Sequence, residues 1–291
     1  MKKKENKAKI TEATEAPQAP QAKVTKKGKK IVLITAVIVL ATILAAGFVY
    51  QHQQTKKSKD SKWGQYALLL IGCQTDFWTE DLIRNFPDFA RNIHSLLAFC
   101  REEGIDIIYL RGQISSDVSE WPPFNRFKGR MPCVKGTGGD EILDFAREEP
   151  GDLVVFKKSF DGFLNTNLNK YLKKNNKKHL LVAGMCSSFC ILSNAFSAFQ
   201  QGYILSLVED CVADDSKLAH KYVIQRYNKF LFNCISAKDI LDLYPQWQQE
   251  LKMLEEINKL GYNPYLNAPD NQVPSPNQPV ECIMSDANLT P

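Results

Sequence analysis

Short apolar segments alternate with amphipathic segments from residue 66 to residue 244, and this alternation restricts the fold more than any other feature. The expected strands are 66–72, 105–110, 152–157, 179–184, 203–210 and 231–235. The expected helices are 86–104, 140–149, 165–176, 187–202, 216–230 and 236–244, with 111–135 as a long loop. Strands that alternate with helices form βαβ units, in which a parallel sheet is covered on both faces. We therefore predict a three-layer α/β/α sandwich around a six-stranded, mainly parallel sheet.

A second apolar segment precedes this domain and has a different character. Residues 31–50 read IVLITAVIVLATILAAGFVY and contain no charged side chain. At a rise of about 1.5 Å per residue, a helix of this length spans roughly 30 Å, the thickness of a bilayer core. Tyr50 stands at one edge, where interfacial aromatic residues are common. We expect one uncleaved transmembrane helix; a buried core helix and a cleaved signal peptide are the alternatives.

The segments around this expected span are polar. Residues 1–30 hold ten lysines and few large apolar side chains, so we expect a disordered basic arm. Residues 51–63 are expected to form a linker, 64–262 the folded domain, and 263–291, rich in Pro, Asn and Gln, a disordered tail. The excess of lysines before the span predicts a cytoplasmic N-terminus for a single-pass membrane protein. Lysines also follow the span, so the side of the folded domain stays open.

The net charge of +5 arises mainly from these flanks. Basic residues beside a membrane span attract anionic lipid. The folded part of the sequence lacks the basic and aromatic stripe that is typical of nucleic-acid binding, so no nucleic-acid partner is expected.

The stretch LLVAGMCSSFC (180–190) holds two of the eight cysteines, Cys186 and Cys190. A disulfide at this spacing on a helix is geometrically unfavourable, and the sequence offers no CxxC pair and only four histidines for a zinc site. Cys190 follows a strand and begins a helix, where free N–H groups and the helix dipole favour a thiolate. Lys157 ends another strand, and strand ends of a parallel sheet meet at one edge. Cys190 is therefore a candidate nucleophile; an ordinary buried cysteine is the alternative.

Three blocks of sequence resemble the isochorismatase-like cysteine hydrolases, a superfamily that includes nicotinamidases, N-carbamoyl amidohydrolases and isochorismatases. The blocks are ALLLIGCQTDFW (67–78), VVFKKSFDGFLNTNL (154–168) and LLVAGMCSSFCILSNAFSAFQQGYILSLVEDCVAD (180–214). In the second block Lys157 precedes Phe163 by six residues, and in the third Cys190 follows Gly184 by six. Both spacings and the order of the blocks are similar to those of the family.

The resemblance implies a role for each matched residue. It implies that Cys190 is the nucleophile, that Lys157 stabilises its thiolate, and that residues 64–262 form a hydrolase domain. It also implies a cis peptide bond near Ser187, in the turn that begins at Cys186, and an oxyanion hole at this turn. The family forms dimers or tetramers, so a homo-oligomer is expected.

The third residue of the family's catalytic trio is missing. The position of the family aspartate, which transfers protons, is occupied by Gly72. Loss of general acid–base catalysis typically costs roughly 10²–10⁴-fold in rate. Asp76, four residues later, could replace this aspartate only if the loop turned its carboxylate inward; a hydrogen bond to the backbone of the turn is the alternative.

The predicted pocket is apolar and free of metal. Nicotinamidases hold a metal with Asp and several histidines after the second strand, whereas residues 111–127 contain no histidine. We predict no metal and no cofactor. Phe77, Trp78, Trp121 and Phe163 are the expected pocket residues, with ordinary packing as the alternative.

Three functions remain open at this stage. The first is a membrane-anchored cysteine hydrolase that acts on a small amide or related C–N bond, with turnover impaired at Gly72. The second is an inactive relative that serves as a binding or interaction module. The third is a thiol redox sensor that uses Cys73, Cys186 and Cys190.

Overall fold

The structure is a computed structural model that describes residues 40–42 and 62–260. These residues fall in two separate units, and the three residues of the first unit are helical. The rest of the expected membrane span 31–50, and the expected arm and tail, lie outside the described residues. Among the described residues, no helix has the length and apolar character needed to cross a membrane.

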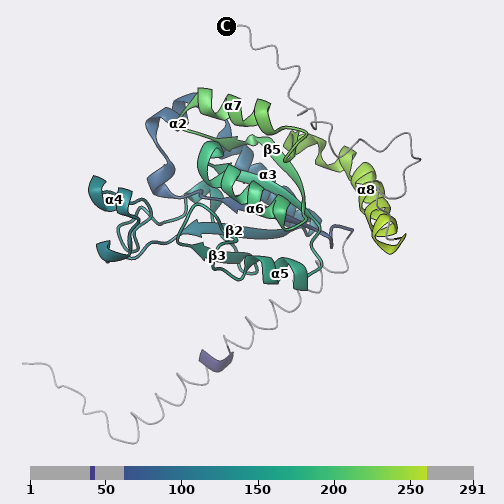
Figure 1. Cartoon of the computed structure of the whole chain (residues 1–291), viewed down its shortest axis with the longest axis horizontal. Coiled ribbons are helices and arrows are strands. Elements are labelled where there is room, and N and C mark those ends of the chain that lie inside the picture. The colour runs from purple at the N-terminus through teal and green to yellow at the C-terminus, as the bar shows by residue number, and fades with distance from the viewer. Residues whose placement is uncertain (1–39, 43–61, 261–291) are drawn as a thin grey trace, which may run out of the picture. The chain divides into compact units, whose positions relative to one another are not determined.

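A six-stranded sheet forms the centre of residues 62–260 (Figure 1). The strands are β1 (Tyr66–Ile71), β2 (Asp106–Gly112), β3 (Leu153–Lys157), β4 (His179–Met185), β5 (Ile204–Ala213) and β6 (Asn233–Ile235). Their order in the sheet is β3-β2-β1-β4-β5-β6, and every neighbouring pair is parallel. The predicted sheet is thus confirmed.

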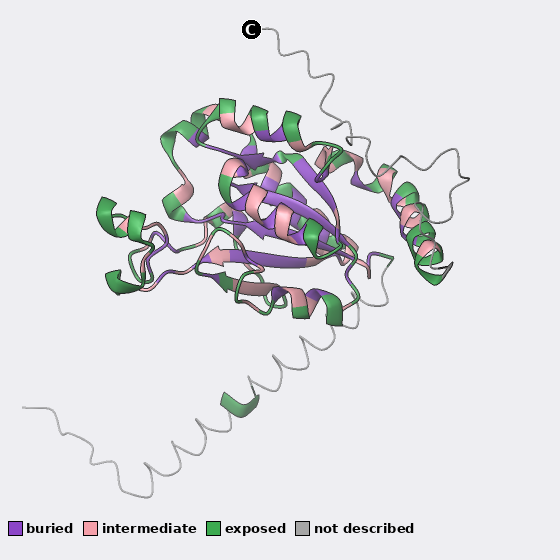
Figure 2. Cartoon of the chain, in the orientation of Figure 1, coloured by how far each residue is buried: buried purple, intermediate pink, exposed green. Residues whose placement is uncertain are grey.

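Helices cover both faces of the sheet, which confirms the three-layer sandwich. Helices α3 (Phe89–Glu103) and α8 (Ile240–Leu260) pack on one face. Helices α5 (Leu168–Lys174), α6 (Leu192–Gln200) and α7 (Lys217–Tyr227) pack on the other. Figure 2 shows a largely buried sheet between helices whose outer sides are exposed.

The central strand β1 shows why the sequence folds in this way. Tyr66, Leu68 and Leu70 point into the core under α3, whereas the alternate residues Ala67, Leu69 and Ile71 point into the core under α6. Side chains of a strand alternate between faces, so a strand between two helical layers must be apolar at every position. All six residues of β1 are accordingly buried.

One predicted helix is wrong, and the predicted end of another is wrong. The segment 140–149 forms only a single 3₁₀ turn, Asp144–Ala146. Ile142 pairs with Gln74 in an antiparallel bridge, and the N–H of Leu143 donates to the carbonyl of Cys73. These contacts with the segment after β1 outweigh the local helical pattern.

The last helix does not end before Pro245 as predicted. A 3₁₀ turn, Ala237–Asp239, leads into α8, which continues through Pro245 to Leu260. Proline removes one helical hydrogen bond. Trp247 and Leu251, which are 3% and 5% exposed, pack into the core beyond it and hold the helix on the sheet.

The predicted loop after β2 contains two short elements, a 3₁₀ turn (Val118–Glu120) and helix α4 (Pro123–Lys128). After β1 come another 3₁₀ turn (Thr75–Phe77) and helix α2 (Glu80–Asn85). The strand order reverses at β1, which lies between β2 and β4. Ligands of open parallel sheets bind at the carboxyl ends of the strands beside such a reversal.

Candidate active site

Lys157 and Cys190 meet at the carboxyl edge of the sheet. Lys157 is the last residue of β3, and its Nζ lies 3.4 Å from Sγ of Cys190. The ammonium also donates to the carbonyl oxygen of Ser159 at 2.9 Å. Lys157 is 2% exposed and Cys190 3% exposed. The two side chains are thus in direct contact and almost fully shielded from water.

Cys190 reaches this place through an irregular turn at the end of β4. The Met185–Cys186 peptide bond is cis, and a π-helical turn, Ser187–Ile191, follows and leads into α6. Gly184 has a φ of +120°, and a side chain there would collide with the backbone of Ile71 in β1. Only glycine lets β4 lie this close to β1 just before the turn.

The residue that faces this turn from β1 is Gly72. Its φ is +66°, and a Cβ built there would lie 2.5 Å from the carbonyl oxygen of Met185 and 3.7 Å from the ring of Phe77. A backbone carbonyl thus borders the position from which an aspartate side chain would extend. The β1 side of the turn therefore offers backbone in place of a proton-transfer group.

Asp76 is tied to a different part of the chain. Its carboxylate accepts a hydrogen bond from the N–H of Cys133 at 2.7 Å, and its own N–H donates to the carbonyl of Gly139 at 3.1 Å. Asp76 is exposed. The Asp76 carboxylate thus accepts a hydrogen bond from the backbone, as in one of the two expectations stated. The donor, however, lies in the loop after β2 and not in the turn that contains Asp76.

Asn194 connects the two elements that hold Lys157 and Cys190. This α6 residue is 1% exposed, and its Oδ1 accepts from the N–H of Gly162 at 2.7 Å. Its Nδ2 donates to the carbonyls of Phe160 at 2.9 Å and Cys190 at 2.7 Å. One buried amide thereby joins the segment after β3 to the turn that holds the thiol. The sequence analysis missed Asn194; its helical spacing of four residues from Cys190 was the available signal.

A buried carboxylate holds the other side of the turn. Oδ2 of Asp214 accepts from Oγ of Ser187 at 2.9 Å and from both the N–H and Oγ of Ser188, at 2.8 and 2.7 Å. Burial alone would raise the pKa of Asp214, but the N–H donors of Ser188 and Ser216 outweigh it and hold this pKa below its ordinary value. Nδ1 of His220 lies 3.3 Å from Oγ of Ser187. The Ser187 hydroxyl therefore faces Asp214 and His220.

The seven cysteines among the described residues are all free thiols. Burial raises the pKa of Cys73 and Cys186 far above the ordinary thiol value, and each is also an electrostatic neighbour of another cysteine. Burial likewise raises the pKa of Cys133 to about 12, with Asp76 adding to the shift. A raised pKa lowers the thiolate fraction and hence the reactivity. These environments do not favour Cys73 and Cys186 as redox-sensing thiols.

The four predicted pocket residues have different neighbours in the structure. Phe77 is the one next to Gly72. Trp78 packs against the rings of Phe89 and Phe145 in the α3 layer, at centroid distances of 6.1 and 5.1 Å. Trp121 donates its indole N–H to the carbonyl of Ser115 at 2.8 Å. Phe163 lies beside Tyr203, at a centroid distance of 6.2 Å.

Two exposed aromatic residues are close in sequence to Cys190 and Lys157. Phe189 precedes Cys190 and is 55% exposed, and Phe160, three residues after Lys157, is 58% exposed. Their ring centroids are 5.8 Å apart. This pair was not predicted from the sequence, because Phe160 follows β3 and Phe189 follows β4, and these two segments meet only in the folded protein.

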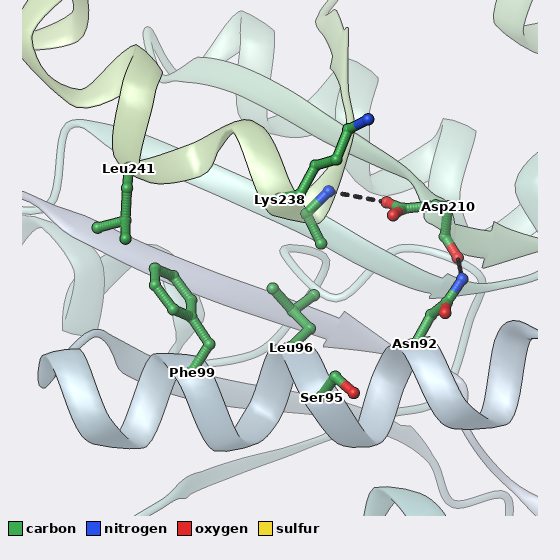
Figure 3. Close-up of a pocket in the computed structure, with 8 residues that line it drawn as sticks. Asn92, Ser95, Leu96, Phe99, Asp210, Lys238 and Leu241 are labelled. Carbon is green, nitrogen blue, oxygen red and sulfur yellow. Dashed lines mark hydrogen bonds between the residues drawn. The ribbon is translucent and has the colours of Figure 1, made fainter.

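A separate pocket of about 350 Å³ lies between α3 and the start of α8 (Figure 3). Two of its polar residues, Asn92 and Asp210, connect these elements. The carboxylate of Asp210 accepts from the N–H of Ala237 and the hydroxyl of Ser236, both at 2.9 Å. The side chain of Asn92 donates to the Asp210 carbonyl at 2.7 Å. Neither Lys157 nor Cys190 lines this pocket.

No group of three or more His, Cys, Asp or Glu side chains within the described part of the chain is placed to hold a metal ion. Residues 111–127 contribute no imidazole. The side chains at the strand ends therefore do not fit the kind of metal site expected for nicotinamidases, and the absence of a metal and of a cofactor stays a prediction.

Comparison with known families identifies the domain. The isochorismatase domain matches residues 66–239. The chain belongs to the isochorismatase family. The match extends from β1 to the 3₁₀ turn before α8, so it includes both Lys157 and Cys190. The resemblance inferred from the three sequence blocks is thus confirmed at the level of the family of isochorismatase-like hydrolases.

Relatives of this chain have different recorded activities. An uncharacterised isochorismatase family protein of Bacillus subtilis, YddQ, is 27% identical over 57% of this chain and 88% of its own length. A "probable inactive nicotinamidase" of Arabidopsis thaliana is 27% identical over 49% of this chain and 76% of its own. A ureidoacrylate amidohydrolase of Agrobacterium fabrum, RutB, is 28% identical over 51% and 76%. The family thus does not by itself decide whether this chain is active.

Solved structures show the same fold. An isochorismatase family protein of Desulfovibrio vulgaris has a TM-score of 0.56 and 25% identity, and the match covers 62% of this chain and 97% of that one. An N-carbamoylsarcosine amidase of Thermoplasma acidophilum has a TM-score of 0.51 and 22% identity, over 60% and 96%. At the latter identity the likeness shows the fold alone.

Proposed function

We propose that this protein is a cysteine hydrolase of the isochorismatase family that acts on a small amide or a related C–N bond. One observation supports this most strongly: Nζ of Lys157 lies 3.4 Å from Sγ of Cys190, and both side chains are almost fully buried. A ureidoacrylate amidohydrolase is among the similar proteins.

In this proposal Cys190 attacks the substrate carbonyl carbon, the C–N bond breaks, and the amine leaves as the acyl thioester forms. Water then attacks the thioester and releases the acid. Lys157 stabilises the thiolate before the attack. Backbone N–H groups of the turn that begins at Cys186 and Ser187 are the proposed donors to the oxyanion.

Proton transfer is the step of this reaction that we expect to be slow. The thiol proton and the proton needed by the leaving amine require an acid–base group, and Gly72 provides none. In this proposal the neutral Lys157 amine in contact with Sγ accepts the thiol proton, becomes the ammonium that stabilises the thiolate, and passes the proton to the leaving amine. Because the same ammonium must stabilise the thiolate, we expect slow turnover and accumulation of the acyl-enzyme.

The test uses the full chain in detergent and a panel of N-carbamoyl amino acids, ureido acids and aromatic carboxamides. We expect slow release of ammonia and a covalent adduct on Cys190, detected by peptide-resolved mass spectrometry. The variant Cys190→Ala should lose both. Release of ammonia that is unchanged in Cys190→Ala would refute the proposal.

A second function, an inactive relative that binds a small molecule, is favoured by the contact at Gly72. The Met185 carbonyl borders the position of the missing carboxylate, 2.5 Å from where a Cβ would stand. A compound from the panel that raises the melting temperature of wild type and Cys190→Ala equally, without ammonia release or adduct, would support this alternative.

We further propose that residues 31–50 anchor the protein in a membrane, with the N-terminus in the cytoplasm. The support is twenty consecutive residues without a charge, flanked by lysines. The full chain should stay with the membrane fraction in alkaline carbonate, and deletion of 31–50 should release it. Release of the full chain would contradict an anchor.

We also propose a homo-oligomer, which light scattering of the purified chain can test.

A further inference from the structure

The loop between β2 and β3 exposes large apolar side chains around helix α4. We name residues 121–139 the α4 excursion. Phe124 is 67% exposed and Phe127 is 89% exposed. The two residues are three apart on α4, so they lie on one side of this short helix. Figure 1 shows α4 standing apart from the helices that cover the sheet, and Figure 2 shows it exposed.

The charge of the α4 excursion has a single sign. It contains Arg126, Lys128, Arg130 and Lys135, all exposed, and no Asp or Glu. Within the described residues, none of these four cations forms an ion pair. The acidic residue just before the excursion, Glu120, pairs with Lys158 at 3.7 Å. The cations are therefore free to contact a negatively charged partner.

The base of the α4 excursion is fixed to the sheet. Ile114, which follows β2, exchanges backbone hydrogen bonds of 2.9 Å with Cys133 and Lys135. The indole N–H of Trp121 donates to the carbonyl of Ser115 at 2.8 Å. Both ends of the segment that contains α4 are thus tied down, and its exposed rings are presented on a fixed base. A segment that is already held in place loses little conformational entropy when it binds a partner.

We propose that the α4 excursion docks on an anionic membrane surface. Aromatic rings are favoured at the interface of a bilayer, where Phe124 and Phe127 would insert. Lysine and arginine are attracted to anionic headgroups, and the four cations, which form no ion pair within the described residues, complement such a surface. This contact is separate from the anchor proposed for residues 31–50, since it arises from the folded domain, and it does not depend on hydrolysis at Cys190.

Two other partners fit the surface less well. A second copy in a two-fold contact would place the same four cations against each other, and like charges in contact repel. Single-stranded nucleic acid binds by stacking bases on open aromatic faces. One face of Phe124 is already occupied, because Nζ of Lys128 lies over its ring at 5.6 Å. Insertion of ring edges into lipid is not hindered in this way.

The test is hydrogen–deuterium exchange of the full chain, reconstituted into vesicles of phosphatidylcholine alone or of phosphatidylcholine mixed with phosphatidylserine. We expect the exchange of peptides within 121–135 to slow roughly tenfold or more in the anionic vesicles. Peptides of α7 (Lys217–Tyr227), which also exposes large side chains, serve as the internal control and should exchange equally in both. High salt should reverse the difference.

Variants localise the effect. The double variant Phe124→Ser/Phe127→Ser should lose the lipid-dependent slowing, whereas the matched surface variant Leu218→Ser/Tyr222→Ser on α7 should keep it. All four side chains are more than half exposed, so neither variant disturbs the core.

Three outcomes would overturn the proposal. Equal exchange of residues 121–135 in both kinds of vesicle would exclude an anionic surface as the partner. Slowing that follows the density of protein in the vesicle, and not the lipid charge, would assign the surface to a second copy. Slowing by added single-stranded RNA, but not by phosphatidylserine, would assign it to nucleic acid.

Discussion

The two sides of the turn that holds Cys190 differ sharply. On the β3 side, the Lys157 amine contacts the thiol, and Asn194 joins the segment after β3 to Cys190 through three hydrogen bonds. On the β1 side, Gly72 has no side chain and the Met185 carbonyl borders the space beside it. The cation that would activate the thiol, Lys157, is thus present, whereas the carboxylate that would transfer protons is absent at Gly72. A protein can keep the first, and with it the ability to bind or to be acylated, while it lacks the second.

The largest expected effect comes from restoring the carboxylate. Gly72→Asp should lower the free energy of unfolding by about 3 kcal/mol or more, because the residue needs a positive φ and its Cβ would meet the Met185 carbonyl. We expect no gain in ammonia release. Chemical denaturation measures the first effect and the substrate panel the second. A Gly72→Asp variant that is stable and more active would contradict the conclusion that the β1 side cannot accommodate a carboxylate.

Two alanine variants separate the causes of that loss. Gly72→Ala has the same Cβ without the charge. Gly129→Ala has a similar backbone, with a φ of +61°, but nothing lies within 4 Å of its Cβ. Gly129→Ala should cost about 1 kcal/mol for the backbone alone. An equal cost at both positions would show that the Met185 carbonyl is not an obstacle.

The next effect concerns Asn194. Asn194→Asp keeps the acceptor for Gly162 but turns an oxygen toward the carbonyls of Phe160 and Cys190, so we expect a loss of about 2–3 kcal/mol in stability. Alkylation of Cys190 should also lose its dependence on Lys157, because the two elements are no longer held in register. Asn169→Asp, on the neighbouring helix α5, is the matched control. Unchanged alkylation in Asn194→Asp would assign Asn194 to packing alone.

A smaller effect is expected from Lys157→Met. Alkylation of Cys190 by iodoacetamide at neutral pH should slow roughly tenfold, since the neighbouring cation no longer favours the thiolate. Stability should stay equal or rise, because an apolar side chain replaces a buried charge. Lys158→Met, whose side chain is 78% exposed, is the control and should leave the rate unchanged. Equal alkylation rates in the wild type, Lys157→Met and Lys158→Met would mean that Lys157 does not activate Cys190.

The last effect is negligible at neutral pH and arises at the opposite end of β4. Burial lowers the pKa of His179 from 6.5 to about 3, so the folded protein keeps this imidazole neutral. Between these two values the unfolded chain binds one more proton, and stability therefore falls as the pH drops below about 6.5, by at most about 1.4 kcal/mol per pH unit. His179→Gln should flatten this slope in denaturation curves. The slope sets the pH range in which alkylation of Cys190 reports on the site and not on unfolding.

Much of the fold was predictable because it depends on patterns that are local in sequence. β1 is apolar at all six positions, which is typical of a strand covered on both faces, and the spacing of Lys157 and Cys190 identified the family. The error at 140–149 has the opposite origin. Ile142 and Leu143 bond to the segment after β1, and no local pattern encodes a contact across so many residues.

The candidate site was less predictable than the fold for the same reason. Sequence shows that Gly72 lacks a carboxylate, but it does not show that the Met185 carbonyl stands beside it. That contact depends on the close approach of β1 and β4 and on the turn after them. The hydrogen bonds of Asn194 and Asp214 likewise join segments that meet only in the folded protein.

The close approach of Gly72 to Met185 also bears on how such a site can evolve. A lost side chain can ordinarily return through a single substitution. Here the returning aspartate would need both a change of backbone conformation at residue 72 and a retreat of the neighbouring carbonyl. A substitution that restores the aspartate alone is therefore expected to destabilise the domain, so the neighbouring backbone sets a condition on any recovery of the carboxylate.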